Sequence, residues 1–193
     1  DSDEVPSWTD PAGLFNSTCT TCYETPLTHG PLVGTIDADA ARIWLRTDAT
    51  RQVKIRVSED RGNLSDSPVV KYVYPSLEND MTSTVHIGGL SPSTLYWYEI
   101  EVENQRYGPW SFTTANPLDT PGRFKFAFGS CSKRDQQPIF GTLNVYDPDI
   151  FLFVGDNHYG NTKDLSSLRQ FYRWAHERPL RKEFMRERSI LAT

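Results

Sequence analysis

The sequence lacks any long apolar run, and it has no excess of basic charge. None of its hydrophobic stretches approaches the roughly 18 residues that a membrane-spanning helix needs. The net charge is −5, whereas nucleic-acid binding favours a basic face. In the arginine-rich segment 173–188 glutamates interleave with the arginines, which is typical of a solvated helix face. The composition therefore predicts neither a membrane span nor a nucleic-acid-binding surface.

Cysteine is scarce, with three residues in the chain. Cys19 and Cys22 form a C-x-x-C pair, and no second pair exists to complete a four-cysteine zinc site. The pair is either a short disulfide loop of a secreted protein or two free thiols. The chain begins at Asp1 instead of methionine, which favours a processed N-terminus. We therefore expect a secreted or periplasmic protein, in which Cys131 is not disulfide-bonded.

The first half of the chain has the pattern of short strands. Its segments are rich in Val, Ile, Tyr, Trp and Thr and are separated by turn residues. In "QVKIRV", Val53, Ile55 and Val57 point one way and Lys54 and Arg56 the other. About seven strands at this spacing predict an antiparallel β-sandwich over residues 31–114, preceded by an N-terminal extension, 1–30.

One stretch of this half is more particular. In "GLSPSTLYWYEIEVE" a leucine and a proline precede a tyrosine that opens a strand, which is a tyrosine-corner arrangement. The stretch resembles the fibronectin type III fold, in which Tyr96 would hydrogen-bond back to the chain near Leu90. Trp44 is expected to be the core tryptophan of an early strand. His29 and His86 are isolated and predict no site.

A linker at 115–122, with two prolines and a glycine, separates this half from a different pattern. In residues 123–193, "FKFAFGSC", "DIFLFVGD" and "SILAT" are predicted strands. "QQPIFGTLNVYD" is a predicted short helix, and a longer helix begins after Asp164 and breaks at Pro179. Alternating strands and helices predict a parallel sheet that needs both faces buried. A sheet of so few elements should expose apolar faces of "FLFVG" and "SILAT" unless a partner segment covers them.

Metal-capable side chains follow two of these strands. Ligands bind beyond the carboxyl ends of parallel strands, and Cys131 and Asp156 both occupy that position. Gly129 and Gly155 lie just before them and permit close backbone approach. With Tyr159, the set offers a thiolate, a carboxylate and a phenolate. Such donors favour iron or another transition metal, and Asp156 can bridge to a second, harder cation.

"GDNHY" after an apolar strand matches the GDxxY motif of calcineurin-like dinuclear metallophosphatases, with the tyrosine spacing of purple acid phosphatases. Together with the "FAFGSCSK" strand and the preceding sandwich, it resembles the alkaline phosphatase D family. The resemblance implies a phosphomonoesterase or phosphodiesterase that uses a metal-bound hydroxide. It also implies that Cys131 and Tyr159 ligate Fe(III), and that Asp156 bridges to a second divalent cation, calcium-like in this family. His158 has no assigned role in the motif and is a minor candidate for substrate contact.

The sequence departs from that family at its end. It stops at "RSILAT", where the family continues with a Trp-Asp-Asp-His element and further histidine ligands. The expected fold is thus a fibronectin III-like β-sandwich followed by an incomplete α/β metallophosphatase domain, with a missing C-terminal segment as partner. Two alternatives are open. Asp156 and His158 also form an Asp-x-His metal motif, and the chain could be a non-catalytic adhesion or positioning module.

Overall fold

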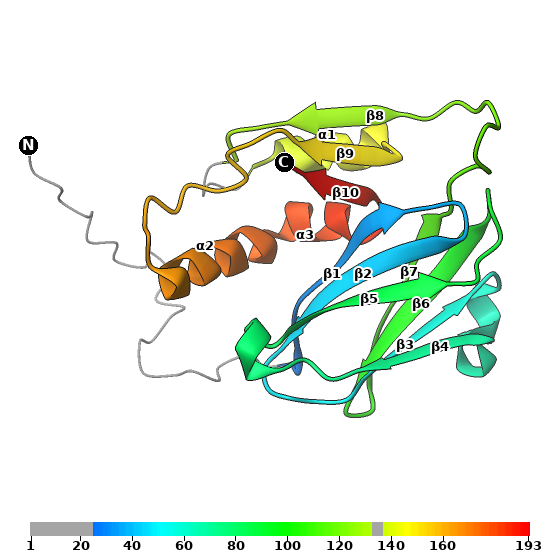
Figure 1. Ribbon diagram of the computed structural model, residues 1–193, viewed down its shortest axis with the longest axis horizontal. Helices are drawn as coiled ribbons and strands as arrows, with labels where there is room; N and C mark the ends of the chain where they lie inside the picture. The colour runs from blue at the N-terminus through cyan, green and yellow to red at the C-terminus, as the bar shows by residue number, and fades with distance from the viewer. Residues whose placement is uncertain (1–24, 133–136) are drawn as a thin grey trace, which may run out of the picture.

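The computed structural model describes residues 25–132 and 137–193. The expected Cys19–Cys22 disulfide therefore lies outside the described residues. A β-sandwich occupies the first part of the chain, as predicted, and a smaller unit of helices and parallel strands rests on it (Figure 1). No helix in the described part of the chain is long and apolar enough to span a membrane.

The sandwich has seven strands in two antiparallel sheets. One sheet has the order β1-β2-β5 and the other the order β4-β3-β6-β7. The elements are β1 (Leu27–Ile36), β2 (Ala40–Thr47), β3 (Val53–Ser58), the 3-10 helix η1 (Arg61–Asp66), β4 (Val69–Val73), the 3-10 helix η2 (Leu77–Asn79), β5 (Thr82–Gly88), β6 (Leu95–Val102) and β7 (Gln105–Thr113). The first strand thus begins four residues before the boundary that we predicted at residue 31.

Alternation along the strands builds the core between the two sheets. Val53, Ile55 and Val57 of β3 are fully buried, in agreement with the pattern of "QVKIRV". The tyrosine corner is also confirmed, since the hydroxyl of Tyr96 accepts a hydrogen bond from the backbone N–H of Ser91 at 2.8 Å. All seven strands and the loop before β6 contribute side chains to this core, those of β4 being only partly buried.

The expectation for Trp44 was wrong. Ile43 and Leu45, its neighbours on β2, are fully buried in the sandwich core. Because successive side chains of a strand point to opposite faces, Trp44 lies on the outer face of the sheet. Its ring packs against His176, with ring centroids 5.2 Å apart.

The second unit contains a three-stranded parallel sheet of order β10-β9-β8, as the sequence predicted. Its helices break at Pro179, and Asp164 caps the longer one through the N–H of Ser167 at 2.7 Å. The elements are β8 (Phe126–Gly129), α1 (Ile139–Tyr146), β9 (Ile150–Phe153), α2 (Leu165–Glu177), α3 (Pro179–Met185) and β10 (Ser189–Ala192).

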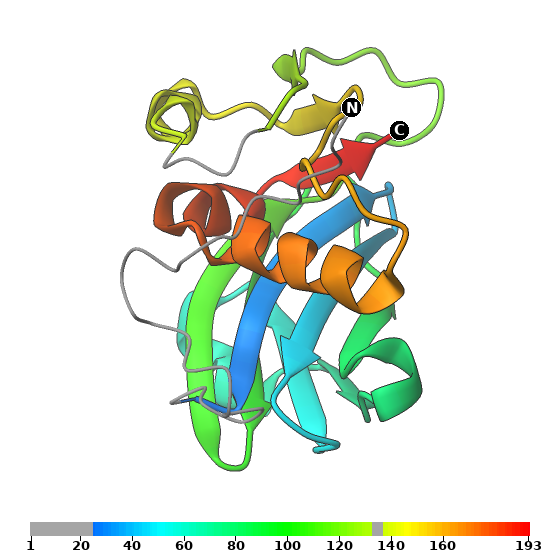
Figure 2. The ribbon, with the colours of Figure 1, turned by 90° about the vertical axis from the view of Figure 1, so that its left-hand side faces the viewer.

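Within the described residues, helices cover one face of the parallel sheet. Helices α1 and α3 lie on that face (Figure 2), and their Phe140 and Phe184 pack against Phe151 of β9. Register places Phe126 and Phe128 of β8 on the opposite face, where they are 46% and 67% exposed. The exposure expected for "FLFVG" and "SILAT" holds in part: Val154 and Leu191 are 44% and 36% exposed, whereas Phe151, Phe153 and Ile190 are buried.

Several polar contacts fasten the second unit to the sandwich. The hydroxyl of Ser189 donates to the carbonyl of Gly34 at 2.9 Å, and that of Tyr98 donates to the carbonyl of Arg186 at 2.5 Å. His29, which the sequence left as isolated, is buried and lies 3.0 Å from a carboxylate oxygen of Glu177. Burial lowers the pKa of His29 even though the hydrogen bond to Glu177 opposes the shift.

Candidate metal centre

The candidate ligands lie at the carboxyl ends of β8 and β9, where the parallel sheet brings two loops together. The backbone N–H of Val154 donates to the carbonyl of Gly129 at 2.9 Å and continues the strand pairing. Beyond it, the N–H of Ser132 donates to the carbonyl of Asp156, also at 2.9 Å. These two bonds fix the distance between the loops that carry Cys131 and Asp156.

The three predicted ligands converge in space. The sulfur of Cys131 lies 3.8 Å from the Oδ2 atom of Asp156, and the hydroxyl of Tyr159 lies 3.3 Å from the same oxygen. Cys131 and Asp156 are exposed and Tyr159 is half-buried, so that the cluster opens to solvent. Among the residues that the structure describes, no group of three or more His, Cys, Asp or Glu side chains could hold a metal.

Both loops contain residues with left-handed backbone conformations, as several turns of this chain do. Cys131 has φ 57° and Asp156 has φ 46°, both in the left-handed region that residues with a Cβ rarely adopt. Gly155, directly before Asp156, has φ 107°. Residues held in such conformations concentrate at functional sites, because the surrounding structure must over-determine them.

Without a cation, negative charges on Cys131, Asp156 and Tyr159 would repel one another. The hydrogen bond with Cys131, burial and the charge of Asp156 raise the pKa of Tyr159 to about 12. A cation placed among the three groups would relieve this repulsion and stabilise the phenolate and thiolate. The donor set therefore fits a metal ion with affinity for sulfur and phenolate oxygen.

His158 takes a different direction from these three residues. Its ring lies against α2, with a centroid 3.9 Å from that of Tyr172 in an edge-on arrangement. This packing favours the set of Cys131, Asp156 and Tyr159 over the Asp-x-His alternative. Asn157, the residue after Asp156, offers its carbonyl oxygen to Arg181 of α3 at 3.3 Å.

Arg181 supports the site and escaped the sequence analysis. Its side chain is 2% exposed, its guanidinium stacks over Phe153, and its Nη1 donates to the hydroxyl oxygen of Ser132 at 2.7 Å. Burial lowers the pKa of Arg181 to about 10. The one available signal was its spacing from Phe184 and Met185, which puts a charged residue on the buried face of a short helix.

Comparison with known proteins agrees with this architecture. A solved structure of PhoD superimposes with a TM-score of 0.76 at 16% sequence identity, over 89% of this chain and 39% of that one. The chain is similar in fold to PhoD. It spans about two fifths of the length of the PhoD chain. A family described as a domain of unknown function, DUF7800, matches residues 24–119. No curated protein matches the sequence.

Other solved structures cover about half of this chain, at TM-scores too low to carry weight. The sensor domain of the anti-sigma factor RsgI4 of Pseudobacteroides cellulosolvens is 17% identical, with a TM-score of 0.36 over 49% of this chain and 100% of that one. A fibronectin type III domain from human KIAA0970 protein is 14% identical, with a TM-score of 0.35 over 53% of this chain and 85% of that one.

Proposed function

We propose that the chain is the N-terminal portion of a secreted, metal-dependent phosphoric ester hydrolase that acts on phosphomonoesters or phosphodiesters. The convergence of Cys131, Asp156 and Tyr159 at the carboxyl ends of parallel strands carries the proposal. The fold likeness to PhoD and the GDxxY motif support it. Residues 123–193 are then the first part of an α/β metallophosphatase domain, and the sandwich precedes it.

In this proposal Cys131 and Tyr159 would hold Fe(III), and Asp156 would be a ligand of the iron and of a second divalent cation such as calcium. When bound, a metal pair lowers the pKa of water and neutralises phosphoryl oxygens, which is the chemistry that phosphate ester hydrolysis needs. The chain's own residues orient this site. The bond from Ser132 to Asp156 and the bonds from Arg181 to both loops hold the carboxylate beside the thiol.

The exposed side of the cluster leaves room for the ester and for further ligands. We propose that these ligands come from a segment of the same protein that follows Thr193. The uncovered face of the parallel sheet supports this. Phe126 and Phe128 are exposed on β8, whereas the strands of parallel sheets are usually buried on both faces.

Iron binding provides a test that does not depend on activity. Fe(III) added to the protein should produce a visible charge-transfer band, because thiolate and phenolate donate charge to ferric iron. Tyr159→Phe should shift the band and reduce iron retention, and Cys131→Ser should remove the sulfur contribution. Asp156→Asn should weaken binding of both cations and abolish phosphoesterase activity. Tyr146→Phe, which alters another exposed tyrosine, is the matched control.

Two results would contradict the proposal. One is a protein that binds only zinc or magnesium. The other is a Tyr159→Phe variant with unchanged spectrum, iron content and activity. A full-length protein that binds no metal and hydrolyses no phosphate ester would instead support the alternative of a non-catalytic positioning module.

A further inference from the structure

A groove of about 760 Å³ separates the outer face of the sandwich from helix α2. Ligand sites in proteins commonly have volumes of roughly 300–1,000 Å³, so the groove is large enough for a small organic molecule. One wall consists of Thr82, Ser83 and Thr84 of β5, and Trp44 and Arg46 of β2 line the groove between the walls. None of Cys131, Asp156 and Tyr159 is among its lining residues.

The opposite wall is an unusual helix face. Arg169, Tyr172, Arg173 and His176 have the spacing of one side of α2, and all four line the groove. A helix packed directly on a sheet presents an aliphatic stripe, whereas this face carries two guanidinium groups and two rings. No residue of α2 is fully buried, which agrees with a helix that borders a hollow.

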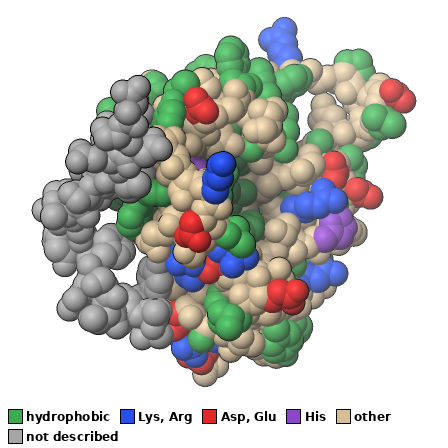
Figure 3. All heavy atoms as spheres, turned by 60° about the vertical axis from the view of Figure 1, so that its left-hand side comes forward, with side chains coloured by type: hydrophobic (Ala, Val, Ile, Leu, Met, Phe, Trp, Pro, Cys, Tyr) green, Lys and Arg blue, Asp and Glu red, His purple; other side chains and the backbone are tan. Residues whose placement is uncertain are grey.

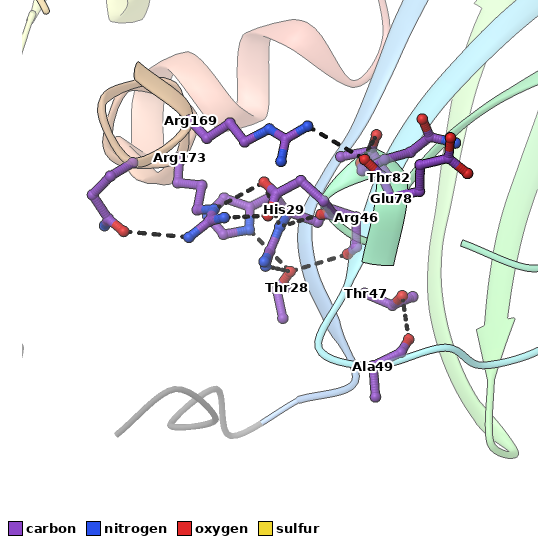
Figure 4. Close-up of polar contacts among 12 residues, drawn as sticks. Thr28, His29, Arg46, Thr47, Ala49, Glu78, Thr82, Arg169 and Arg173 are labelled. Carbon is purple, nitrogen blue, oxygen red and sulfur yellow. Dashed lines mark hydrogen bonds and ion pairs between the residues drawn. The ribbon is translucent and has the colours of Figure 1, made fainter. Parts of the chain in front are cut away.

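Positive charge is concentrated in the groove although the whole chain carries −5. The lining holds three arginines and one carboxylate, a local net charge of +2. Asp80 pairs with both Arg46, at 3.4 Å, and Arg173, and so fixes two guanidinium groups with a single negative charge. Arg169 donates to the carbonyl oxygen of Glu78 at 3.3 Å. Figure 4 shows Arg169 and Arg173 extending from α2 toward the sandwich. Figure 3 shows basic and acidic side chains interspersed over the face of the molecule that it draws.

Three ring side chains also line the groove. The ring of Trp44 lies 5.2 Å from that of His176, and the ring of Tyr172 lies 6.5 Å from that of His176, centroid to centroid. Burial lowers the pKa of His176 to about 3, so this imidazole is a neutral ring near pH 7. Guanidinium groups and hydroxyls recognise oxyanions, and stacked rings recognise planar groups.

We propose that this groove binds an organic oxyanion that carries a planar ring, of the aryl phosphate class. Arg169 and the hydroxyls of β5 contact the anionic oxygens, and Trp44, Tyr172 and His176 contact the ring. The inference uses none of the proposed metal ligands, although Tyr172 also contacts His158, which lies in the same loop as Asp156 and Tyr159.

Phenylphosphonate is a suitable probe, since its carbon–phosphorus bond resists phosphate ester hydrolysis, and methylphosphonate provides the anion without the ring. Isothermal titration of the full chain should show that phenylphosphonate binds more tightly than methylphosphonate. Arg169→Gln should weaken the binding of both probes about tenfold, the effect of one charge-assisted hydrogen bond. Tyr172→Leu should weaken only phenylphosphonate. Arg61→Gln, which makes the same charge change outside the groove, should bind as the wild type does.

Asp156→Asn separates this groove from the metal centre and should leave the binding of both probes unchanged. The proposal is overturned if neither probe binds, or if Arg169→Gln behaves like Arg61→Gln. It is also overturned if Asp156→Asn abolishes binding while Arg169→Gln does not, since the ligand would then lie at the metal centre. Far-UV circular dichroism of each variant checks that the fold is retained.

Discussion

Replacing Asp80 by asparagine should remove the charge that holds α2 to the sandwich and leave the other contacts of α2 in place. The residue follows η2 with φ 54° and ψ 37°, a conformation that asparagine adopts readily, so the backbone should not change. Its carboxylate is 18% exposed and pairs with Arg46 and Arg173. Burial favours a higher pKa for Asp80, but the hydrogen bond from Arg173 and the charge of Arg46 outweigh it, and the pKa is lowered.

The expected loss follows from this partial burial. Breaking a buried ion pair costs about 3–5 kcal/mol, and breaking an exposed one costs about 0–1 kcal/mol. A carboxylate with about one fifth of its surface exposed lies between these limits, so Asp80→Asn should reduce the free energy of unfolding by about 2 kcal/mol. Urea denaturation at pH 7 measures this quantity. Asp37→Asn is the control, because Asp37 and Arg42 are about half exposed and 3.8 Å apart, and it should cost less than about 0.5 kcal/mol.

The pH dependence gives a second check on Asp80. A carboxylate with a lowered pKa in the folded state stabilises the protein above its unfolded pKa, and this stabilisation is lost as the pH falls through the folded pKa. The difference in unfolding free energy between wild type and Asp80→Asn should therefore be complete well above the unfolded-state pKa of about 4, and should shrink as the pH falls below it. A variant as harmless as Asp37→Asn, or a difference that persists at low pH, would refute the reasoning.

Three further outcomes are expected. Phe184→Ala, at a fully buried ring between α1 and β9, should cost about 3–5 kcal/mol in urea denaturation. The pKa of His176 is lowered to about 3, so the stability that its neutral form contributes should be complete above about pH 6.5 and lost toward pH 3. Between these pH values the unfolding temperature of His176→Phe should therefore fall less than that of the wild type. Arg181→Met should speed amide exchange at Ser132 about tenfold, and Lys182→Met should not, as mass spectrometry of exchanged peptides would show.

Local patterns account for what could be predicted. Alternation in β3 and the uncharged centre of β9 follow from which faces are buried, and these patterns are visible in any short window of sequence. The pairing of Cys131 with Asp156 needed one more rule, that neighbouring parallel strands end at the same rim. Trp44 was misassigned because aromatic character was given more weight than its position between Ile43 and Leu45.

Contacts between the two units could not be predicted, because no local pattern encodes them. His29 and Glu177 are 148 positions apart, and Asp80 and Arg173 are 93 apart. In the sequence each is an ordinary charged or titratable residue on a strand, turn or helix. Only the placement of α2 along the outer face of the sandwich turns them into buried pairs. The same placement makes the groove, so the residues that would bind an oxyanion are recognisable only once the two units are seen together.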